Sequence, residues 1–583
     1  MSTPTAVGGE SASGRPTGTG RRWPHVLGVG AIASIYATLY SAYLLGLHAT
    51  LKDGLADVGE YDQAISGYAH FMGPHSPFIG LRGPGDAGVL QLSDHFTPLL
   101  VLLAPFYWIH DGPETLFIET AVLSALPIIP LWIYARRAVA RFGHDGRFGR
   151  TAATVSAYLV VIGYGVTWPL QMALWFEFHE VFLELPILMW AIERAHAGRL
   201  RQAALISLLL LGVKDDMGFV VALFGLYLAA KDATLRDWAR LLRRAARRPL
   251  LLLGTLRRRD RAWFLALVPI GLGMVWLVAQ VLLPAFGGSP NRDFTYTEFG
   301  PTQSAALHAM LADPAHTAHT LINTPVKRQT LEMLLWPVLG LCLLSPLSLV
   351  AVPLVAERFL SVNQLYWVMP YHYNAFLVPI IFCGGVDGAL RLSRWLAWSW
   401  RSAKDKPAVA ALRGTARRGA RSLVASRARP AVARIEARVT GRYPLAISAL
   451  MMAFAAYVAG YGWNTFARYP MHHMTMASFW NTSAPSVVAA KQAAARIPDG
   501  VYVAAATQLG PQLLSRDKVV MWGPPGDRAY PAPSWIVADV QRSSYPFTNV
   551  AAQQAEVRRL ESAGYRVVFQ SDGWVVLHDP SPR

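Results

Sequence analysis

Cysteine is scarce in this sequence: only Cys342 and Cys383 occur among 583 residues, and both lie in apolar segments. Two such thiols imply no disulfide framework, and they lack the spacing of a metal-binding cluster. The sequence also contains no CxxC, P-loop or HExxH pattern. We therefore interpret both cysteines as small packing residues and find no signature of thiol-redox, nucleotide-binding or zinc-hydrolase chemistry.

Charge is the second shortage. Only 15% of the residues are charged and 53% are hydrophobic, whereas soluble domains carry roughly 25% charged residues. Apolar runs of a length that crosses a bilayer recur along most of the chain. The sequence therefore predicts a mainly α-helical, polytopic membrane bundle of about 11 spans.

Basic residues are concentrated in two segments. Residues 231–261 carry a net charge of +8 and residues 391–442 carry +12, so the rest of the +18 chain is about neutral. Basic loops between apolar helices are typical of the cytoplasmic side of membrane proteins. The pattern argues against nucleic acid as a partner and favours membrane lipids.

The N-terminal region sets the predicted orientation. Residues 1–25 form a disordered cytoplasmic tail in this interpretation, because the first 20 are rich in Gly, Ser, Thr and Pro. The apolar run Val26–Leu47 is long enough to cross a bilayer and too long for a cleaved signal. The transmembrane domain is predicted over 26–464, with an outer loop at 48–97 and a second polar outer loop at 284–329.

Residues 485–583 differ from the rest of the chain. They are predicted to form a small extracytoplasmic α/β domain, because short strand-like segments alternate there with one amphipathic helix at 551–562. No glycine-rich phosphate fingerprint accompanies them, so we assign this domain no cofactor. The predicted strands are 501–505, 519–522, 535–540, 566–570 and 574–577.

Polar groups from distant segments converge in this topology at the outer face. Ionisable groups near membrane depth are costly and usually line a cavity. The candidate catalytic residues are Asp57 and Asp62. The candidate substrate-binding residues are Asp94, His95, Glu177, His179, Glu180, Lys214, Asp215 and His372.

Two chemical roles suit this set. A carboxylate acts as a general base or stabilises an electron-poor sugar carbon. A lysine, a histidine or a carboxylate-held divalent cation neutralises a departing phosphate, and the sequence leaves the need for a metal open. The alternatives are a solvated, self-paired turn at residues 214–216 and hydrogen-bonded packing roles for His179 and His372.

Several motifs in this sequence resemble those of the bacterial membrane-protein family known as domain of unknown function 2079. The resemblance covers most of residues 26–583 outside the basic loops. The third motif departs mildly from the family, since it reads Lys-Asp-Asp where Lys-Glu-Asp is expected. The motifs are Asp57-Val58-Gly59-Glu60-Tyr61-Asp62-Gln63, Asp94-His95-Phe96-Thr97-Pro98, Phe178-His179-Glu180, Lys214-Asp215-Asp216, Glu357-Arg358-Phe359-Leu360-Ser361, Tyr371-His372-Tyr373 and Gly564-Tyr565-Arg566-Val567-Val568.

That family is similar in layout to the C-type membrane glycosyltransferases, which have the GT-C fold. Those enzymes use polyprenyl-phosphate-linked sugars and place an essential acidic residue in a long outer loop soon after the first helix. The resemblance implies that Asp57 is the nearest match to the catalytic acid, followed by Asp62. This step is an analogy from fold to function.

Three functions follow as hypotheses for this multi-pass cell-membrane protein. The favoured one is a GT-C-type glycosyltransferase that moves a sugar from a polyprenyl-phosphate donor to an acceptor at the outer membrane face. The second is a transporter or flippase for a lipid or polar solute, although no internal repeat supports it. The third is a non-catalytic membrane scaffold. The sequence does not identify the sugar or the acceptor.

Overall fold

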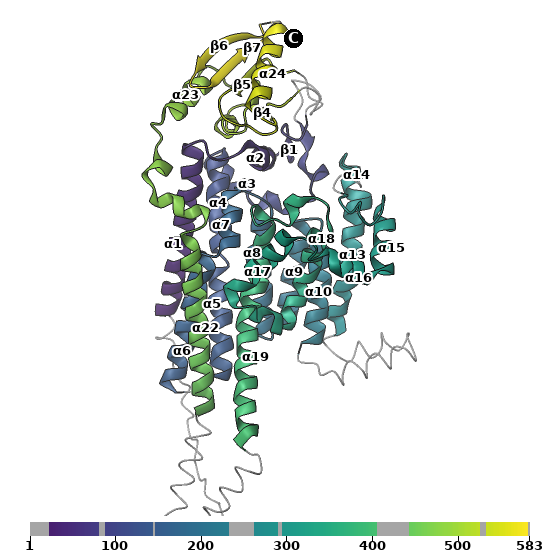
Figure 1. The fold of residues 1–583 in the computed structure, drawn as a ribbon, viewed down its shortest axis with the longest axis vertical. Helices are drawn as coiled ribbons and strands as arrows, with labels where there is room; N and C mark the ends of the chain where they lie inside the picture. The colour runs from purple at the N-terminus through teal and green to yellow at the C-terminus, as the bar shows by residue number, and fades with distance from the viewer. Residues whose placement is uncertain are drawn as a thin grey trace, which may run out of the picture.

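The computed structural model describes residues 23–80, 88–143, 146–231, 262–289, 294–404, 442–524 and 532–580. Most of these residues form a helical bundle, and a small sheet-containing domain covers one end of it (Figure 1). The predicted fold class, a mainly helical membrane protein with a small C-terminal α/β region, is therefore confirmed.

Six helices among the described residues are long and apolar enough to cross a membrane. Two shorter apolar helical segments, Leu200–Gly212 and Met217–Ala230, accompany them. The predicted number of about 11 crossings exceeds these six long and two shorter helical segments, so it is approximate. The six long helices are Pro24–Ala49, Pro113–Phe142, Arg147–Trp175, Trp263–Ala285, His372–Ser399 and Pro444–Phe466.

Prolines interrupt the helical pattern between α17 (Pro325–Leu335) and α18 (Val352–Leu360). Residues 336–351 form the short 3-10 turns η6 (Trp336–Val338), η7 (Leu341–Leu344) and η8 (Pro346–Ala351) before α18 (Val352–Leu360). Pro337 and Pro346 stand at the starts of two of these turns, where a missing N–H removes no helical hydrogen bond.

The segment predicted as the outer loop 48–97 contains regular secondary structure. It contains the 15-residue helix α2 (Leu55–Ala69) and a short antiparallel pair, β1 (His75–Ser76) with β2 (Val89–Leu90). Helix α2 forms because apolar side chains at helical spacing, among them Leu55, Val58 and Ile65, are buried on one side. The prediction of a loop missed this helix.

The segment predicted as a second polar outer loop, 284–329, also contains helices. Helices α15 (Gln303–Ala312), α16 (Pro314–Thr320) and α17 (Pro325–Leu335) occupy much of it. Each helix begins after a residue whose side chain accepts a backbone N–H, which is a strong start signal. These capping residues are Thr302, Asp313 and Thr324.

The C-terminal region forms a five-stranded mixed sheet with strand order β4-β3-β5-β7-β6. Strand β3 runs parallel to both β4 and β5, whereas β7 runs antiparallel to β5 and β6. The five predicted strands all exist, each within one residue of its predicted bounds. The elements are α23 (Pro485–Ala494), β3 (Tyr502–Ala505), β4 (Lys518–Met521), β5 (Trp535–Asp539), α24 (Val550–Ser562), β6 (Arg566–Ser571) and β7 (Trp574–His578).

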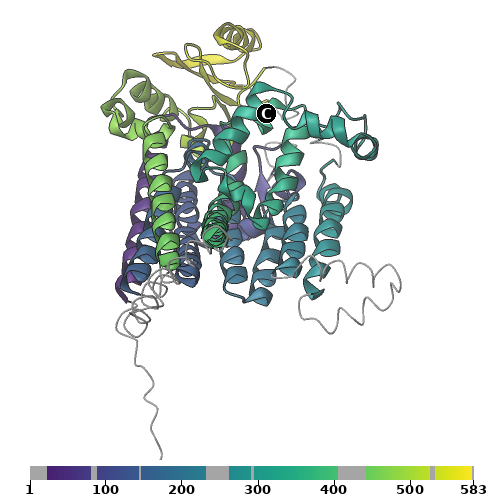
Figure 2. The same ribbon diagram turned by 60° about the horizontal axis from the view of Figure 1, so that its bottom comes forward.

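This C-terminal domain rests on α2, as Figure 1 shows. Figure 2 shows the domain at the same end of the bundle from a second direction. Gln63 on α2 donates to the backbone oxygen of Val519 in β4 at 3.1 Å. Gln512 of the domain donates to the backbone oxygen of His48 at the end of α1 (Trp23–Ala49) at 3.0 Å. The domain therefore covers the segment that the sequence marked as functional.

The predicted basic loop 231–261, apart from Lys231, and most of the N-terminal tail lie outside the described residues. The second predicted basic loop begins later than expected, because helix α19 (Val378–Lys404) continues through residues 391–404. Residues 405–441 of that loop also lie outside the described part of the chain.

Candidate functional site

Helix α2 carries Asp57 in its first turn, and two other parts of the chain hold the start of this helix. The backbone N–H of Gly54 donates to Glu177 Oε1 at 2.7 Å, and that of Leu55 donates to Thr507 Oγ1 at 3.1 Å. The first N–H groups of a helix have no intrahelical acceptor, so these contacts satisfy them. They also fix the position of Asp57.

Asp57 is half-buried among charged groups from three other segments. Burial raises its pKa above the ordinary aspartate value, and the Glu180 carboxylate adds to this rise. The positive charges of His179, His95 and Lys214 act in the opposite direction. The predicted convergence of these distant residues on one place is therefore present in the structure.

Glu180 is the centre of this group and is fully buried. Its carboxylate accepts a hydrogen bond from the Tyr61 hydroxyl, lies 2.7 Å from Lys214 Nζ and pairs with His179 Nδ1. Burial alone would raise the pKa of Glu180, but the charges of His179 and Lys214 hold it well below its usual range. Glu180 is thus a fixed anion that positions the groups around it.

Lys214 lies in the turn between the apolar segments Leu200–Gly212 and Met217–Ala230. Burial would lower its pKa, but the charges of Glu180, Asp216 and Asp215 raise it well above the usual lysine value. The ammonium group therefore stays charged. Because its side chain is only 12% exposed, it is a preorganised cation suited to a phosphate.

Three histidine rings lie beside this ion pair. The rings of His179 and His372 stack with centroids 3.4 Å apart, and His95 lies 6.4 Å from His179. His95 Nδ1 is 3.6 Å from Asp215 Oδ1. Burial would lower the pKa of His95, but Asp215 and Glu180 raise it to about 10, so this ring is a second cation.

Asp94 and Glu177 lie at the edges of the cluster. Asp94 is buried with its Oδ2 3.8 Å from His95 Nε2. Glu177 adopts a left-handed backbone conformation with φ +70°, which is strained for a residue other than glycine and typical of functional positions. Its carboxylate holds Gly54, and burial raises its pKa well above the usual glutamate value.

Asp62, the second candidate catalytic residue, lies on a different face of α2. Five residues along a helix correspond to a rotation of about 140° from Asp57. The Asp62 carboxylate accepts a hydrogen bond from the Tyr107 hydroxyl at 2.8 Å. Its pKa rises to about 7 through burial and through Asp111 and Glu114, which belong to a separate cluster.

The cluster also contains acidic residues that were not among the site residues predicted from the sequence. Glu184 follows Glu180 by one helical turn on α8 (Val181–His196), and both its carboxylate oxygens are buried without a hydrogen-bond partner among the described residues. Burial raises the pKa of Asp216 to about 6. The spacing of four residues after Glu180 is a signal from which Glu184 could have been found.

Arg358, which belongs to one of the family motifs, is buried, and its charge acts on His372 of the cluster. Its Nε donates to the Tyr366 backbone oxygen at 2.7 Å, and its Nη2 donates to Asn374 Oδ1 at 3.0 Å. Burial lowers its pKa to about 9. The preceding carboxyl of Glu357 has a pKa well above its usual range through burial and through Asp216.

No group of three or more His, Cys, Asp and Glu side chains within the described ranges is arranged to hold a metal ion.

A family model described as "Predicted membrane protein (DUF2079)" matches residues 47–414. This chain belongs to that family. The match covers α2 and every residue of the cluster from Asp57 to His372, whereas the C-terminal domain lies beyond it. The resemblance that the sequence motifs indicated is therefore confirmed. No curated protein matches the chain.

Solved structures similar to this DUF2079 chain include ArnT from Cupriavidus metallidurans, both bound to undecaprenyl phosphate and in the apo state. The lipid-bound structure is 14% identical with a TM-score of 0.43, and the match covers 96% of this chain and 100% of ArnT. The apo structure is 14% identical with a TM-score of 0.42, and the match covers 96% of this chain and 99% of ArnT. Arabinosyltransferase EmbB from Mycobacterium smegmatis is 14% identical with a TM-score of 0.29, covering 74% of this chain and 41% of EmbB.

Proposed function

We propose that this DUF2079 protein is a glycosyltransferase that moves a sugar from a polyprenyl-phosphate donor to an acceptor hydroxyl at the extracytoplasmic membrane face. One observation carries the proposal. Asp57, a carboxyl whose pKa burial raises, shares a charged cluster with the Lys214 ammonium, which Glu180 holds at 2.7 Å. A base and a fixed cation are the two groups that sugar transfer from a phosphate requires.

In the proposed reaction, Asp57 takes the proton of the acceptor hydroxyl. The hydroxyl oxygen forms a bond to the anomeric carbon of the sugar while the bond from that carbon to the phosphate oxygen breaks. The electron pair leaves with the phosphate. Lys214 and His95 stabilise the negative charge that develops there, because both are cationic in this environment.

The remaining candidate residues bind or orient the substrate in this proposal. The stacked rings of His179 and His372 form one wall, and Asp215 holds His95 from the other side. Asp94 lies beside His95, and Glu177 holds the start of α2. A preorganised set of this kind lowers the cost of reorganisation during the reaction.

The surface near α2 fits a donor that is anchored in lipid. The short elements η2 (Pro98–Leu102) and α3 (Ala104–Tyr107) lie against α2 and expose the apolar side chains of Val101, Leu102 and Phe106. Exposed apolar groups beside a membrane bundle are suited to contact with acyl or prenyl chains. The donor phosphate would then reach Lys214 from the side.

The proposal is tested with the full chain purified in lipid nanodiscs and a panel of polyprenyl-phosphate sugars. A membrane extract serves as the source of acceptors, and mass spectrometry follows the release of polyprenyl phosphate. We expect turnover of at least one donor by the wild type. Lys214→Gln should reduce the rate by about 10²–10³-fold, the loss that follows removal of one charge-stabilising donor.

The matched control is Lys491→Gln on α23, which removes an exposed lysine far from α2 in the chain. It should leave turnover unchanged. If the wild type released polyprenyl phosphate from no donor in the panel, yet moved labelled lipid between the two leaflets, transport would replace transfer as the function.

A further inference from the structure

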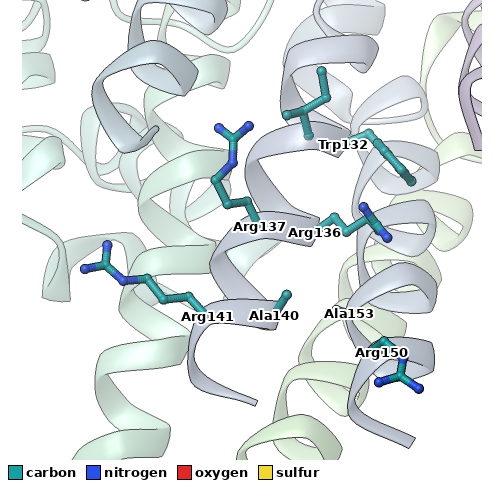
Figure 3. A pocket seen from close by; sticks show the side chains of 8 residues that line it. Trp132, Arg136, Arg137, Ala140, Arg141, Arg150 and Ala153 are labelled. Atoms are coloured by element: carbon teal, nitrogen blue, oxygen red, sulfur yellow. The ribbon is translucent and has the colours of Figure 1, made fainter. Parts of the chain in front are cut away.

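A second polar feature lies at the opposite end of the bundle from the sheet. A pocket of about 540 Å³ opens between α5 (Ile128–Phe142) and α6 (Arg147–Gly165). Four arginines line it together with Trp132, as Figure 3 shows. They are Arg136, Arg137, Arg141 and Arg150.

The pocket carries more positive than negative charge. Arg137 pairs with the fully buried carboxylate of Glu193, which Arg194 also contacts, so two cations share one anion. No carboxylate belongs to the described residues that line the pocket. Apart from the Arg137–Glu193 pair, the charged side chains that line the pocket are therefore cationic, and an excess of positive charge in a hollow attracts counter-ions.

Two of the arginines are positioned by uncharged groups. Arg136 donates from Nε to Thr154 Oγ1 at 3.3 Å and lies over the Trp132 ring at 5.3 Å. Arg141 lies over the Phe142 ring at 5.5 Å. Because such contacts orient a guanidinium without neutralising it, both groups remain available to an anion.

The position of the pocket points to a lipid headgroup. It surrounds the end of the apolar span Pro113–Phe142, which is 30 residues and therefore about 45 Å long. The span begins beside α2, so its far end lies at the other boundary between hydrocarbon and water. Phospholipid phosphates occupy that boundary, and Arg recognises phosphate through paired N–H groups.

We propose that this arginine pocket is a binding site for the phosphate of an anionic phospholipid headgroup, such as that of phosphatidylglycerol or cardiolipin. The inference is independent of the proposed glycosyltransferase activity, because it uses different residues at the other end of the molecule. A free phosphate monoester shares the chemistry of the headgroup, so the test must separate the two sources.

Native mass spectrometry of the full chain in detergent measures the binding of phosphatidylglycerol, phosphatidylcholine and soluble glycerol phosphate. We expect phosphatidylglycerol to bind in preference to the zwitterionic lipid. Arg136→Gln with Arg150→Gln should weaken that binding by at least about tenfold, since each basic group near a membrane surface contributes measurably to anionic lipid binding. Arg137 is left intact because it pairs with buried Glu193.

The matched control is Arg199→Gln with Arg201→Gln, which removes the same charge from exposed positions at the start of α9 (Leu200–Leu208). It should change binding less than about threefold. Equal losses in both double variants would show diffuse attraction and overturn the proposal. Displacement by glycerol phosphate at lipid-like concentrations would also overturn it, in favour of a soluble ligand.

Arg141→Gln provides a second variant if the double variant fails to fold, because it leaves the contacts of Arg136 in place. It should weaken phosphatidylglycerol binding while the melting temperature without lipid stays unchanged. Unaltered binding in a folded Arg141→Gln protein would count against the pocket.

Discussion

Two aspartates on one helix illustrate how neighbouring residues decide chemistry. Asp57 and Asp62 are both in α2 and both near buried polar groups. Asp57 lies among His179, Glu180 and Lys214, whereas Asp62 contacts the Tyr107 hydroxyl. The surroundings of the two carboxyls therefore differ. We propose only Asp57 as the catalytic base, even though the sequence predicted both as catalytic residues.

Substitution of these aspartates tests that difference. Asp57→Asn should reduce sugar transfer by about 10²–10⁴-fold, because the amide keeps the shape of the side chain but cannot act as a base. Asp62→Asn should keep transfer within a few fold of the wild type. Initial rates of polyprenyl phosphate release from nanodisc samples measure both. Full activity in Asp57→Asn would disprove its role as the base.

Glu60 lies one helical turn after Asp57 on α2, and its pKa predicts how the stability of the protein changes with pH. Burial raises the pKa of this carboxyl to about 7 in the folded protein, against 4.5 for an ordinary glutamate. The folded state thus holds the proton more tightly. The protonated Glu60 carboxyl therefore contributes to the free energy of unfolding. This contribution is complete below about pH 4.5 and is lost as the pH rises through 7, and the change is on the order of 3 kcal/mol.

Glu60→Gln should therefore flatten the fall in melting temperature between about pH 4.5 and 7, and it should raise stability at pH 8. Thermal melts of the detergent-solubilised protein at several pH values measure this slope. Glu561→Gln, an exposed position at the end of α24, is the control and should leave the slope as in the wild type. An unchanged slope in Glu60→Gln would contradict the prediction.

At the scale of elements, the sequence predicted long helices and strands better than short helices. Apolar runs of membrane length and alternating strand segments are strong signals, and the predicted first span, Val26–Leu47, lies within α1. Helices α15, α16 and α17 lack such a run. Their capping residues Thr302 and Thr324 are start signals, but such a residue predicts a helix only weakly when no apolar run follows it.

The candidate site was likewise predictable in part. Topology was enough to bring Asp57, Glu180 and Lys214 to one end of the bundle, because loops on one side of a membrane lie near one another. The sequence could not reveal that Glu180 is the shared partner, since side-chain pairing depends on distances between helices. It also missed Glu184, whose role depends on which side of α8 faces the cluster.

The contact between the C-terminal domain and α2 can be tested directly. Thr507→Val removes the acceptor for the Leu55 N–H, and Gln512→Leu removes the donor to the His48 oxygen. Each lost hydrogen bond should cost about 1 kcal/mol. We expect faster hydrogen exchange at the start of α2 and slower sugar transfer in the double variant.

Ser562→Ala is the control for this pair, because among the described residues its hydroxyl bonds within α24, to the Arg558 oxygen. It should leave exchange in α2 and the transfer rate unchanged. If the double variant exchanged like the wild type over residues 55–60, the domain would cover α2 without stabilising it.

The whole molecule has two chemically different ends. The C-terminal domain and α2 lie at one end of the bundle, whereas the parts of α5 and α6 that line the arginine pocket lie toward the other (Figure 1). Arginine-rich helix ends are typical of the cytoplasmic side. We therefore propose that the cluster and the C-terminal domain are extracytoplasmic.

This orientation predicts the outcome of cysteine labelling on intact cells. Both native cysteines are buried, so introduced thiols give a clear signal. An impermeant reagent should label Ser562→Cys in the C-terminal domain and leave Ala140→Cys near the pocket unlabelled. A permeant reagent should label both variants, which shows that each thiol is accessible. The reverse pattern with the impermeant reagent would invert the proposed topology.

The hydrogen bond between Leu55 and Thr507 has a consequence for biosynthesis. The two residues are 452 positions apart in the chain. At about 5–20 residues per second, a ribosome needs roughly 20–90 s to make the segment between them. Helix α2 is therefore present in the nascent chain long before its cover exists. The start of α2 therefore gains its Thr507 acceptor only after most of the chain has been made, so during synthesis the Leu55 N–H must pair with another acceptor or with water.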